Sequence, residues 1–248
     1  MSDAVFISDL HLHPDDAAID LRFRAFIDWA VVHTKAVYIL GDLFHACDGS
    51  EGDDAWTQSI AILFQRLSSL GIAVYYLPGN RDFLIKPAFL KQAGLNLLTD
   101  PYTLTLNQEP VLLTHGDQYC THDKGHMWLR WVTRNAWFVG LFLHLPARLK
   151  KRLVQGVRHR SATQSGKSAY QLAIVTDVML QEMKQFEVKK VIHGHIHQPG
   201  THEFYENFTQ YVLSDWDENP KILCYDLSKG FYFVQMNEFE GNDNGNNR

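Results

Sequence analysis

The sequence has 248 residues, 46% apolar side chains and a net charge of −5, which suits one large globular domain and excludes a disordered chain. Three scattered cysteines without CxxC spacing (Cys47, Cys120 and Cys224) favour a reducing compartment and argue against a disulfide framework or a zinc knuckle. The N-terminus has no basic segment, and no stretch reaches the roughly 18–20 apolar residues that span a bilayer, so we expect a cytoplasmic protein without a signal peptide or transmembrane helix.

Strands and helices alternate along the first part of the chain. Short apolar runs bounded by glycine or acids predict strands at 4–9, 36–42 and 72–77 and a hairpin of 102–106 with 111–114. Apolar residues at helical spacing predict helices at 20–33, 55–70 and 88–93, with Gly71 and Gly94 as stop signals. The 36–42 strand is the element around which we expect the rest of the chain to be organised.

The alternation breaks at about residue 120. Lys124 to Thr176 contains ten Lys and Arg but no acid, which leaves 13 Lys and Arg against 28 acids elsewhere. Such asymmetry marks a separate surface with its own partner. Beyond it we predict a helix at 167–186, a strand at 188–192 and antiparallel strands within 203–236. The predicted domains are a core in two parts (1–120 and 171–238), a helical insertion (121–170) and a disordered tail (239–248).

Five predicted strand ends carry polar residues of one kind. They are Asp9-Leu-His11, Gly41-Asp42, Gly79-Asn80-Arg81-Asp82, Thr114-His115-Gly116-Asp117 and His193-Gly-His195-Ile-His197. In an extended chain residues i and i+2 point the same way, so Asp9 and His11 are expected to bind one ion together. Histidine, aspartate and asparagine without cysteine favour Mn²⁺, Fe or Zn²⁺. Each motif alone has a structural explanation as a turn, but all five in order predict two metal ions bridged by Asp42.

These motifs, over residues 5–197, resemble the calcineurin-like metallophosphoesterase superfamily. The resemblance implies an α+β fold (αββα), a β-sandwich flanked by helices. It also implies one metal ion on Asp9, His11, Asp42 and His197, and a second on Asp42, Asn80, His115 and His195. Two such ions would activate a water molecule that attacks phosphorus.

Arg81 stands where the superfamily pattern usually has histidine. Histidine can protonate a poor alkoxide leaving group, whereas arginine keeps its proton and holds phosphate oxygens in a bidentate fork. A phosphate monoester, whose second pKa is about 6, leaves without needing a proton. Arg81 therefore favours pyrophosphate cleavage, unless it is only a surface ion-pair partner.

The acid-free insertion combines crowded Trp and Phe residues with a basic amphipathic segment at 148–160. Its apolar stripe is Leu149, Leu153, Val154 and Val157, and Lys151, Arg152, Gln155 and Arg158 lie opposite. This pattern suits an anionic membrane surface. The alternative is a helical hairpin whose aromatic residues form its own core. We favour a lid that packs on the sandwich and holds lipid chains between the two.

The chain resembles, more narrowly, the UDP-2,3-diacylglucosamine diphosphatases of lipid A synthesis. The motifs are Tyr38 to Phe44, Gly79 to Phe83, His115 to Cys120 and Ile192 to Pro199. This resemblance implies hydrolysis of UDP-2,3-diacylglucosamine to UMP and 2,3-diacylglucosamine 1-phosphate with two Mn²⁺, by a monomer peripheral to the cytoplasmic side of the inner membrane. It implies catalytic roles for Asn80, Arg81, His115 and His195, and substrate contacts from Asn80, Arg81, Asp123, Ser161, Gln164, Lys167 and His195. Gln164 departs from the usual asparagine, and Lys167 could instead be a solvated lysine.

Two other functions remain open from the residues alone. A metallophosphoesterase acting on another nucleotide or a nucleic-acid phosphodiester would also use a basic patch with aromatic residues, although the missing histidine after Asn80 argues against nucleic acid. A metal-binding scaffold without turnover is the third possibility, which the complete ligand set disfavours.

Overall fold

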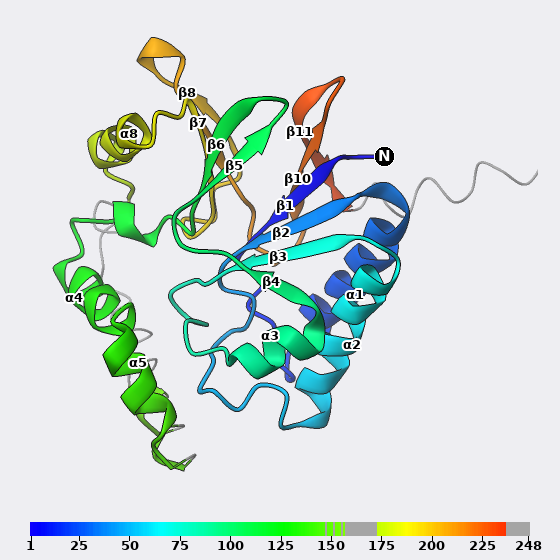
Figure 1. Cartoon of the computed structure of the whole chain (residues 1–248), viewed down its shortest axis with the longest axis vertical. Coiled ribbons are helices and arrows are strands. Elements are labelled where there is room, and N and C mark those ends of the chain that lie inside the picture. The colour runs from blue at the N-terminus through cyan, green and yellow to red at the C-terminus, as the bar shows by residue number, and fades with distance from the viewer. Residues whose placement is uncertain (147, 151, 155, 157–172, 237–248) are drawn as a thin grey trace, which may run out of the picture.

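The computed structural model describes residues 1–146, 148–150, 152–154, 156 and 173–236. Two β-sheets lie side by side, and helices cover the outer faces (Figure 1). The first sheet has the strand order β11-β10-β1-β2-β3-β4 and the second has β5-β6-β7-β9-β8. The predicted disordered tail, residues 239–248, lies outside the described part of the chain.

The first sheet is parallel in its middle and antiparallel at one edge. Its parallel strands are β1 (Ala4–Ile7), β2 (Ala36–Leu40), β3 (Ala73–Leu77) and β4 (Leu95–Leu97). The antiparallel strands are β10 (Lys221–Asp226) and β11 (Gly230–Gln235). The outer face is covered by α1 (Ala17–His33), α2 (Ala55–Ser69) and α3 (Pro87–Ala93).

The second sheet combines two hairpin-like pairs around a parallel centre. Its strands are β5 (Tyr102–Leu106), β6 (Glu109–Leu113), β7 (Lys190–His193), β8 (Gly200–Glu203) and β9 (Thr209–Val212). Strands β6, β7 and β9 are parallel, while β5 and β8 pair antiparallel at the edges. Helix α8 (Thr176–Gln185) packs on its outer face.

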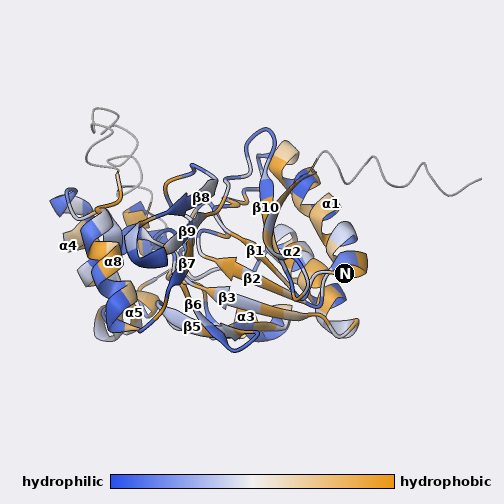
Figure 2. Cartoon of the chain, turned by 90° about the horizontal axis from the view of Figure 1, so that it is seen from above, coloured by the Kyte–Doolittle hydropathy of each residue, from blue (hydrophilic) through white to orange (hydrophobic). Residues whose placement is uncertain are grey.

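Alternation along the strands divides the core into layers. Val5 and Ile7 belong to the cluster under α1 and α2, whereas Phe6 between them belongs to the cluster between the sheets. In β6, Val111 and Leu113 face the first sheet while Leu112 faces α8. This period-two pattern with both faces buried produces continuous apolar runs. Figure 2 shows the hydrophobic residues concentrated on the central strands β1 and β2. The predicted αββα class is confirmed.

Two helices follow β6 and the short turn of helix Asp117–Tyr119. They are α4 (Lys124–Thr133) and α5 (Ala136–Leu143), and Figure 1 shows them running in succession down one side of the molecule. Phe142 at the end of α5 reaches the core cluster under the first sheet. None of the helices in the described residues has the length and apolarity needed to cross a membrane.

Several predicted boundaries were wrong. The strand predicted at 4–9 ends at Ile7, because Asp9 adopts a left-handed φ of 54°. The helix predicted at 167–186 begins at Thr176; residues 173–175 are not helical, and 167–172 lie outside the described residues. Strand β4 was missed because three residues carry no readable period. Strand β9, expected among antiparallel strands, also pairs in parallel with β7.

Candidate metal centre

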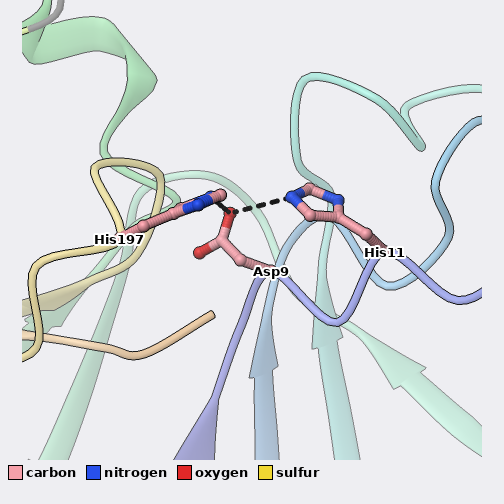
Figure 3. Close-up of side chains that lie close together, drawn as sticks. All are labelled: Asp9, His11 and His197. Atoms are coloured by element: carbon pink, nitrogen blue, oxygen red, sulfur yellow. Dashed lines mark ion pairs between the residues drawn. The ribbon is translucent and has the colours of Figure 1, made fainter. Parts of the chain in front are cut away.

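The five predicted strand ends come from both sheets. Asp9, Asp42 and Asn80 follow β1, β2 and β3, whereas His115 and the pair His195 and His197 follow β6 and β7. Parallel strands bring their carboxyl ends to one edge of each sheet, and the two edges meet here. Figure 3 shows the rings of His11 and His197 on either side of the Asp9 carboxylate.

Five of the seven predicted ligands are held in the left-handed backbone region. Their φ angles are 54° at Asp9, 49° at His11, 52° at Asp42, 68° at His195 and 54° at His197. Asp and His enter this region more readily than most residues, but the conformation still costs energy and gathers at functional sites. The expectation that Asp9 and His11 meet as i and i+2 of an extended chain is therefore wrong. They meet because the chain turns sharply after β1.

One candidate ligand group consists of Asp9, His11 and His197. Asp9 Oδ1 lies 4.0 Å from His11 Nε2 and 3.4 Å from His197 Nε2. The other Asp9 oxygen accepts hydrogen bonds from the Ser8 hydroxyl (2.6 Å) and the His195 backbone N–H (2.8 Å). This division holds the carboxylate with Oδ1 facing the two imidazoles.

A second candidate group consists of Asp9, Asp42 and His115. Asp42 Oδ1 lies 3.7 Å from His115 Nε2, and Asp42 Oδ2 lies 4.0 Å from His11 Nδ1, so Asp42 stands between the two imidazoles. His115 Nδ1 is 2.9 Å from the Leu40 carbonyl oxygen, to which an N–H there donates. Its Nε2 is 2.8 Å from Asn80 Oδ1. The hydrogen bond from His115 Nδ1 to the Leu40 carbonyl fixes which ring nitrogen of His115 can bind a metal ion.

The predicted ligand His195 lies beside these groups. Its ring centre is 5.1 Å from that of His115, although neither group of closely spaced ligand atoms includes His195 among the described residues. Asp42, at the centre, also accepts a hydrogen bond from the Arg81 N–H at 2.9 Å. All seven residues predicted as ligands thus lie around Asp9 and Asp42.

Two glycines leave room for the carboxylates. A Cβ at Gly79 would be 2.1 Å from Asp42 Oδ1, and a Cβ at Gly194 would be 2.1 Å from Asp9 Oδ2. Because both positions have ordinary φ angles, glycine is needed there for space rather than for backbone freedom.

Charge and burial prepare these side chains to bind a cation. Asp9 and Asp42 are almost completely buried, yet Asp9 Oδ1 and both His11 ring nitrogens have no hydrogen-bond partner. Burial lowers the pKa of His11 to about 2 and that of His195 to about 3, which keeps both imidazoles neutral. Burial alone would lower the pKa of His115, but the Asp42 and Asp9 carboxylates raise it to about 9. Buried polar atoms without partners are costly unless they bind something.

Four further residues support the site, and three of them, Asp100, Asp215 and His126, were missed by sequence reasoning. Asp82 accepts hydrogen bonds from the Gly79 and Leu43 N–H groups, which ties the Gly79–Asn80 turn to the segment after β2. Asp100 accepts from the Thr114 hydroxyl at 2.6 Å, beside His115. Two of these side chains face the ligand histidines: Asp215 Oδ2 lies 3.3 Å from His197 Nδ1, and the ring of His126 stacks on His195 at 5.4 Å. Asp215 carried a readable signal, since it too follows an apolar strand.

The predicted substrate residues are placed unevenly. Arg81 is near the metal ligands, with Nε 3.4 Å from Asp42 Oδ2 and 40% of its side chain exposed. Asp123 is buried and caps α4, where its Oδ1 accepts the His126 N–H at 3.0 Å. Ser161, Gln164 and Lys167 lie outside the described residues.

A family model of calcineurin-like phosphoesterases matches residues 4–199. The chain belongs to this family. Two curated relatives are named UDP-2,3-diacylglucosamine hydrolase: one from Pseudomonas paraeruginosa is 39% identical over 90% of this chain and 95% of its own length, and one from Pseudomonas putida is 38% identical over 95% and 98%. A solved archaeal phosphodiesterase shares the fold, with a TM-score of 0.50 and 13% identity over 94% of this chain and 98% of its own.

Membership in the calcineurin-like phosphoesterase family makes the protein a hydrolase and implies divalent metal ions. The residues fit such ions, because the donors are carboxylate oxygens and imidazole nitrogens, and because Asp9 and His11 hold buried atoms without partners. Asp9, His11, Asp42, His115 and His197 are the candidate ligands in the two closely spaced groups.

Proposed function

We propose that this phosphoesterase hydrolyses the pyrophosphate of UDP-2,3-diacylglucosamine, releasing UMP and 2,3-diacylglucosamine 1-phosphate with two Mn²⁺. The names of the relatives at 38–39% identity support the substrate. The observation that carries the proposal is the Arg81 guanidinium, 3.4 Å from Asp42 Oδ2 and open to solvent on one side. Arginine cannot act as a general acid but grips phosphate oxygens, so the site suits a leaving group that departs as a phosphate.

We assign the metal ligands as two sets that share Asp42. The first set is Asp9, His11, Asp42 and His197, and the second is Asp42, Asn80, His115 and His195. When bound, the ions would supply Lewis-acid activation of water and neutralise charge on the phosphoryl group. Neutral imidazoles at His11 and His195 are the form that binds metal, and the Leu40 carbonyl and Asp215 orient the rings of His115 and His197.

The remaining roles concern substrate positioning. Asn80 and Arg81 hold the pyrophosphate, with His195 next to it, and Asp123 contacts the glucosamine. Ser161, Gln164 and Lys167 complete the cleft in this proposal. The Arg81 backbone N–H donates to Asp42, and the partly exposed Arg81 side chain, which lies beside the same carboxylate, reaches the phosphate oxygens in this proposal. Holding the phosphorus close to the attacking water is worth several kcal/mol of the barrier.

Residues 121–170, of which 147, 151, 155 and 157–170 lie outside the described part of the chain, form the lid in this proposal and attach the monomer to the cytoplasmic side of the inner membrane. On α4 and α5 the side chains of Trp128, Trp131, Trp137 and Leu141 are 66%, 71%, 88% and 72% exposed, in a segment without acids. Exposed Trp and Leu beside Lys and Arg favour an anionic lipid surface.

The test is UMP release from UDP-2,3-diacylglucosamine by the Mn²⁺-loaded protein, with the chelator-treated protein as blank. His115→Ala should abolish release, and Arg81→Lys should lower kcat/KM by about a hundredfold because one point charge replaces a two-pronged grip. Arg66→Lys, an exposed arginine on α2 paired with Asp28, is the matched control and should change nothing. No release above the blank by protein that binds Mn²⁺ would refute the proposal, and cleavage of single-stranded DNA instead would support the nucleic-acid alternative.

A further inference from the structure

Two cavities of opposite chemical character occur among the described residues. One, of about 470 Å³, is bounded by His11, His197 and Arg81 of the proposed site and by His13, His45 and Asp217. Ile19 is its single apolar lining residue. The other, of about 370 Å³, is lined by Trp137, Gly140, Leu141 and His144 of α5 and its C-terminal end. The first cavity is lined mainly by charged and imidazole side chains, and the second mainly by apolar groups.

A chain of side-chain contacts places the polar cavity and α4 at different ends of the site. At one end, His126 of α4 stacks on His195, whose ring is 5.1 Å from His115. At the other end, the ring of His11 is 6.2 Å from that of His45, which is 5.4 Å from that of His13. Asp42 joins the two ends, since its oxygens face both His115 and His11.

We infer that the polar cavity is the subsite for the nucleoside monophosphate half of the substrate, with the pyrimidine base held by His13 and His45. The inference rests on the proposed function and deepens it. A pyrophosphate bridging a nucleoside and a diacylated sugar must extend in two directions from the metal ligands. Acyl chains cannot enter a cavity with one apolar side chain without losing their burial energy. The nucleotide half is therefore the part that this cavity accepts.

The cavity offers one matching group for each part of a nucleotide. The Arg81 guanidinium, with Nη1 3.5 Å from His45 Nδ1, faces the phosphate. The rings of His13 and His45 meet edge to face, with 78° between their planes, and the His13 side chain is 41% exposed, so its ring is accessible to a base. The Asp217 carboxylate is exposed at the rim, where it can accept hydrogen bonds from ribose hydroxyls.

The charge around the polar cavity and the volume of that cavity also favour the nucleotide half of the substrate. Asp15 and Asp16 join Asp217 around the cavity, so its rim repels an anionic lipid surface or a nucleic-acid strand with many phosphates. A neutral ribose and base pass such a rim without this penalty. The volume of about 470 Å³ is within the range of about 300–1,000 Å³ of small-molecule sites.

The experiment measures binding of UMP and of inorganic phosphate to the Mn²⁺-loaded full chain by calorimetry. The variants are His13→Ala, His45→Ala and His45→Phe, with His202→Ala, an exposed histidine on β8, as the matched control. Removing either ring should weaken UMP binding about tenfold, the scale of losing one base–ring stack, while phosphate affinity stays within twofold. His45→Phe should retain most of the UMP affinity. Calorimetric titration with Mn²⁺ checks that each variant still binds the metal.

The outcomes separate this inference from the proposed function. Equal UMP affinity in all variants, or equal loss of UMP and phosphate affinity, would overturn the subsite. Cleavage of UDP-2,3-diacylglucosamine without UMP binding in this cavity would also overturn it while the hydrolase proposal stands. Selective loss of UMP affinity in a protein that does not cleave this substrate would support the subsite and refute the substrate.

Discussion

Replacing Gly194 with alanine should weaken both the fold and the metal centre, although it adds only one methyl group. In Gly194→Ala the new Cβ would lie 2.1 Å from Asp9 Oδ2 and 2.2 Å from the Ser8 hydroxyl oxygen. These separations are about 1 Å shorter than real Cβ contacts, so the carboxylate or the backbone after β7 must move by about that much. Neither neighbour is a flexible chain end, because Asp9 and Ser8 are both buried.

The magnitude follows from what Asp9 would lose. Its Oδ2 would give up hydrogen bonds from Ser8 and from the His195 N–H, and its Oδ1 would shift relative to His11 and His197. Overpacking and a buried acceptor without its donors each cost about 1–3 kcal/mol of unfolding free energy. A displacement of about 1 Å in a catalytic array costs about a hundredfold in rate.

Urea unfolding, Mn²⁺ titration by calorimetry and kcat/KM for UMP release measure these three losses in one protein. Gly200→Ala is the control, since its Cβ would meet only His202 Nε2, at an ordinary 3.8 Å. We expect the control to behave as wild type. If Gly194→Ala bound Mn²⁺ and turned over within twofold of wild type, the reasoning that this glycine makes space for Asp9 would be wrong.

The remaining predictions concern stability and reactivity. Arg130→Gln should lower the unfolding free energy in urea by about 2 kcal/mol, since it removes one of two arginine partners from the buried carboxylates of Asp117 and Asp100, while the exposed Arg66→Gln should cost less than about 1 kcal/mol. Asp54→Ala should cost about 1 kcal/mol by removing the α2 cap, with Asp54→Asn near wild type. Burial opposes the Asp54 charge, but hydrogen bonds from Thr57 and Trp56 lower its pKa. The stability that the charge adds is therefore present above the unfolded pKa and is lost as pH falls through the folded one, so the difference in urea midpoint between wild type and Asp54→Ala should shrink in acid. A thiol reagent should label no cysteine in the folded protein and three after unfolding, because burial raises the pKa of all three thiols: Cys47, Cys120 and Cys224.

The strands of the sheet core could be predicted from the sequence because the pattern that marks them is local. An apolar run that stops at Gly-Asp or Gly-Asn marks the carboxyl end of a buried strand, and parallel strands place such ends at one edge. Asp42 and His115 were predicted in this way and lie 3.7 Å apart. The hairpin of β5 and β6 was readable for the same reason, since both strands and their turn lie within 12 residues.

The residues that support the metal ligands could not be predicted because the groups that they contact are distant in the chain. Asp100 supports Thr114, and through Arg130 and Arg134 it joins α4 to the core, yet nothing near Asp100 in the sequence indicates these contacts. The start of α8 was lost for a different reason. No side-chain cap marks this start, because Val175 stands at the N-cap position, and an apolar residue there gives no start signal.

Strain explains why the ligands can be positioned by the protein rather than gathered by the metal. Each left-handed Asp or His costs about 1–3 kcal/mol and persists only where neighbouring groups fix it. The fixing bonds are visible: the Asp9 N–H donates to the Gly41 carbonyl at 3.1 Å, and the His11 N–H donates to the Asp42 carbonyl at 3.0 Å. The Gly194 N–H donates to the His115 carbonyl at 3.0 Å, which links two strands of the second sheet, and the His195 N–H joins the two sheets through Asp9. Because these bonds run between loops that carry ligands, weakening one of them should change metal affinity before it changes the fold.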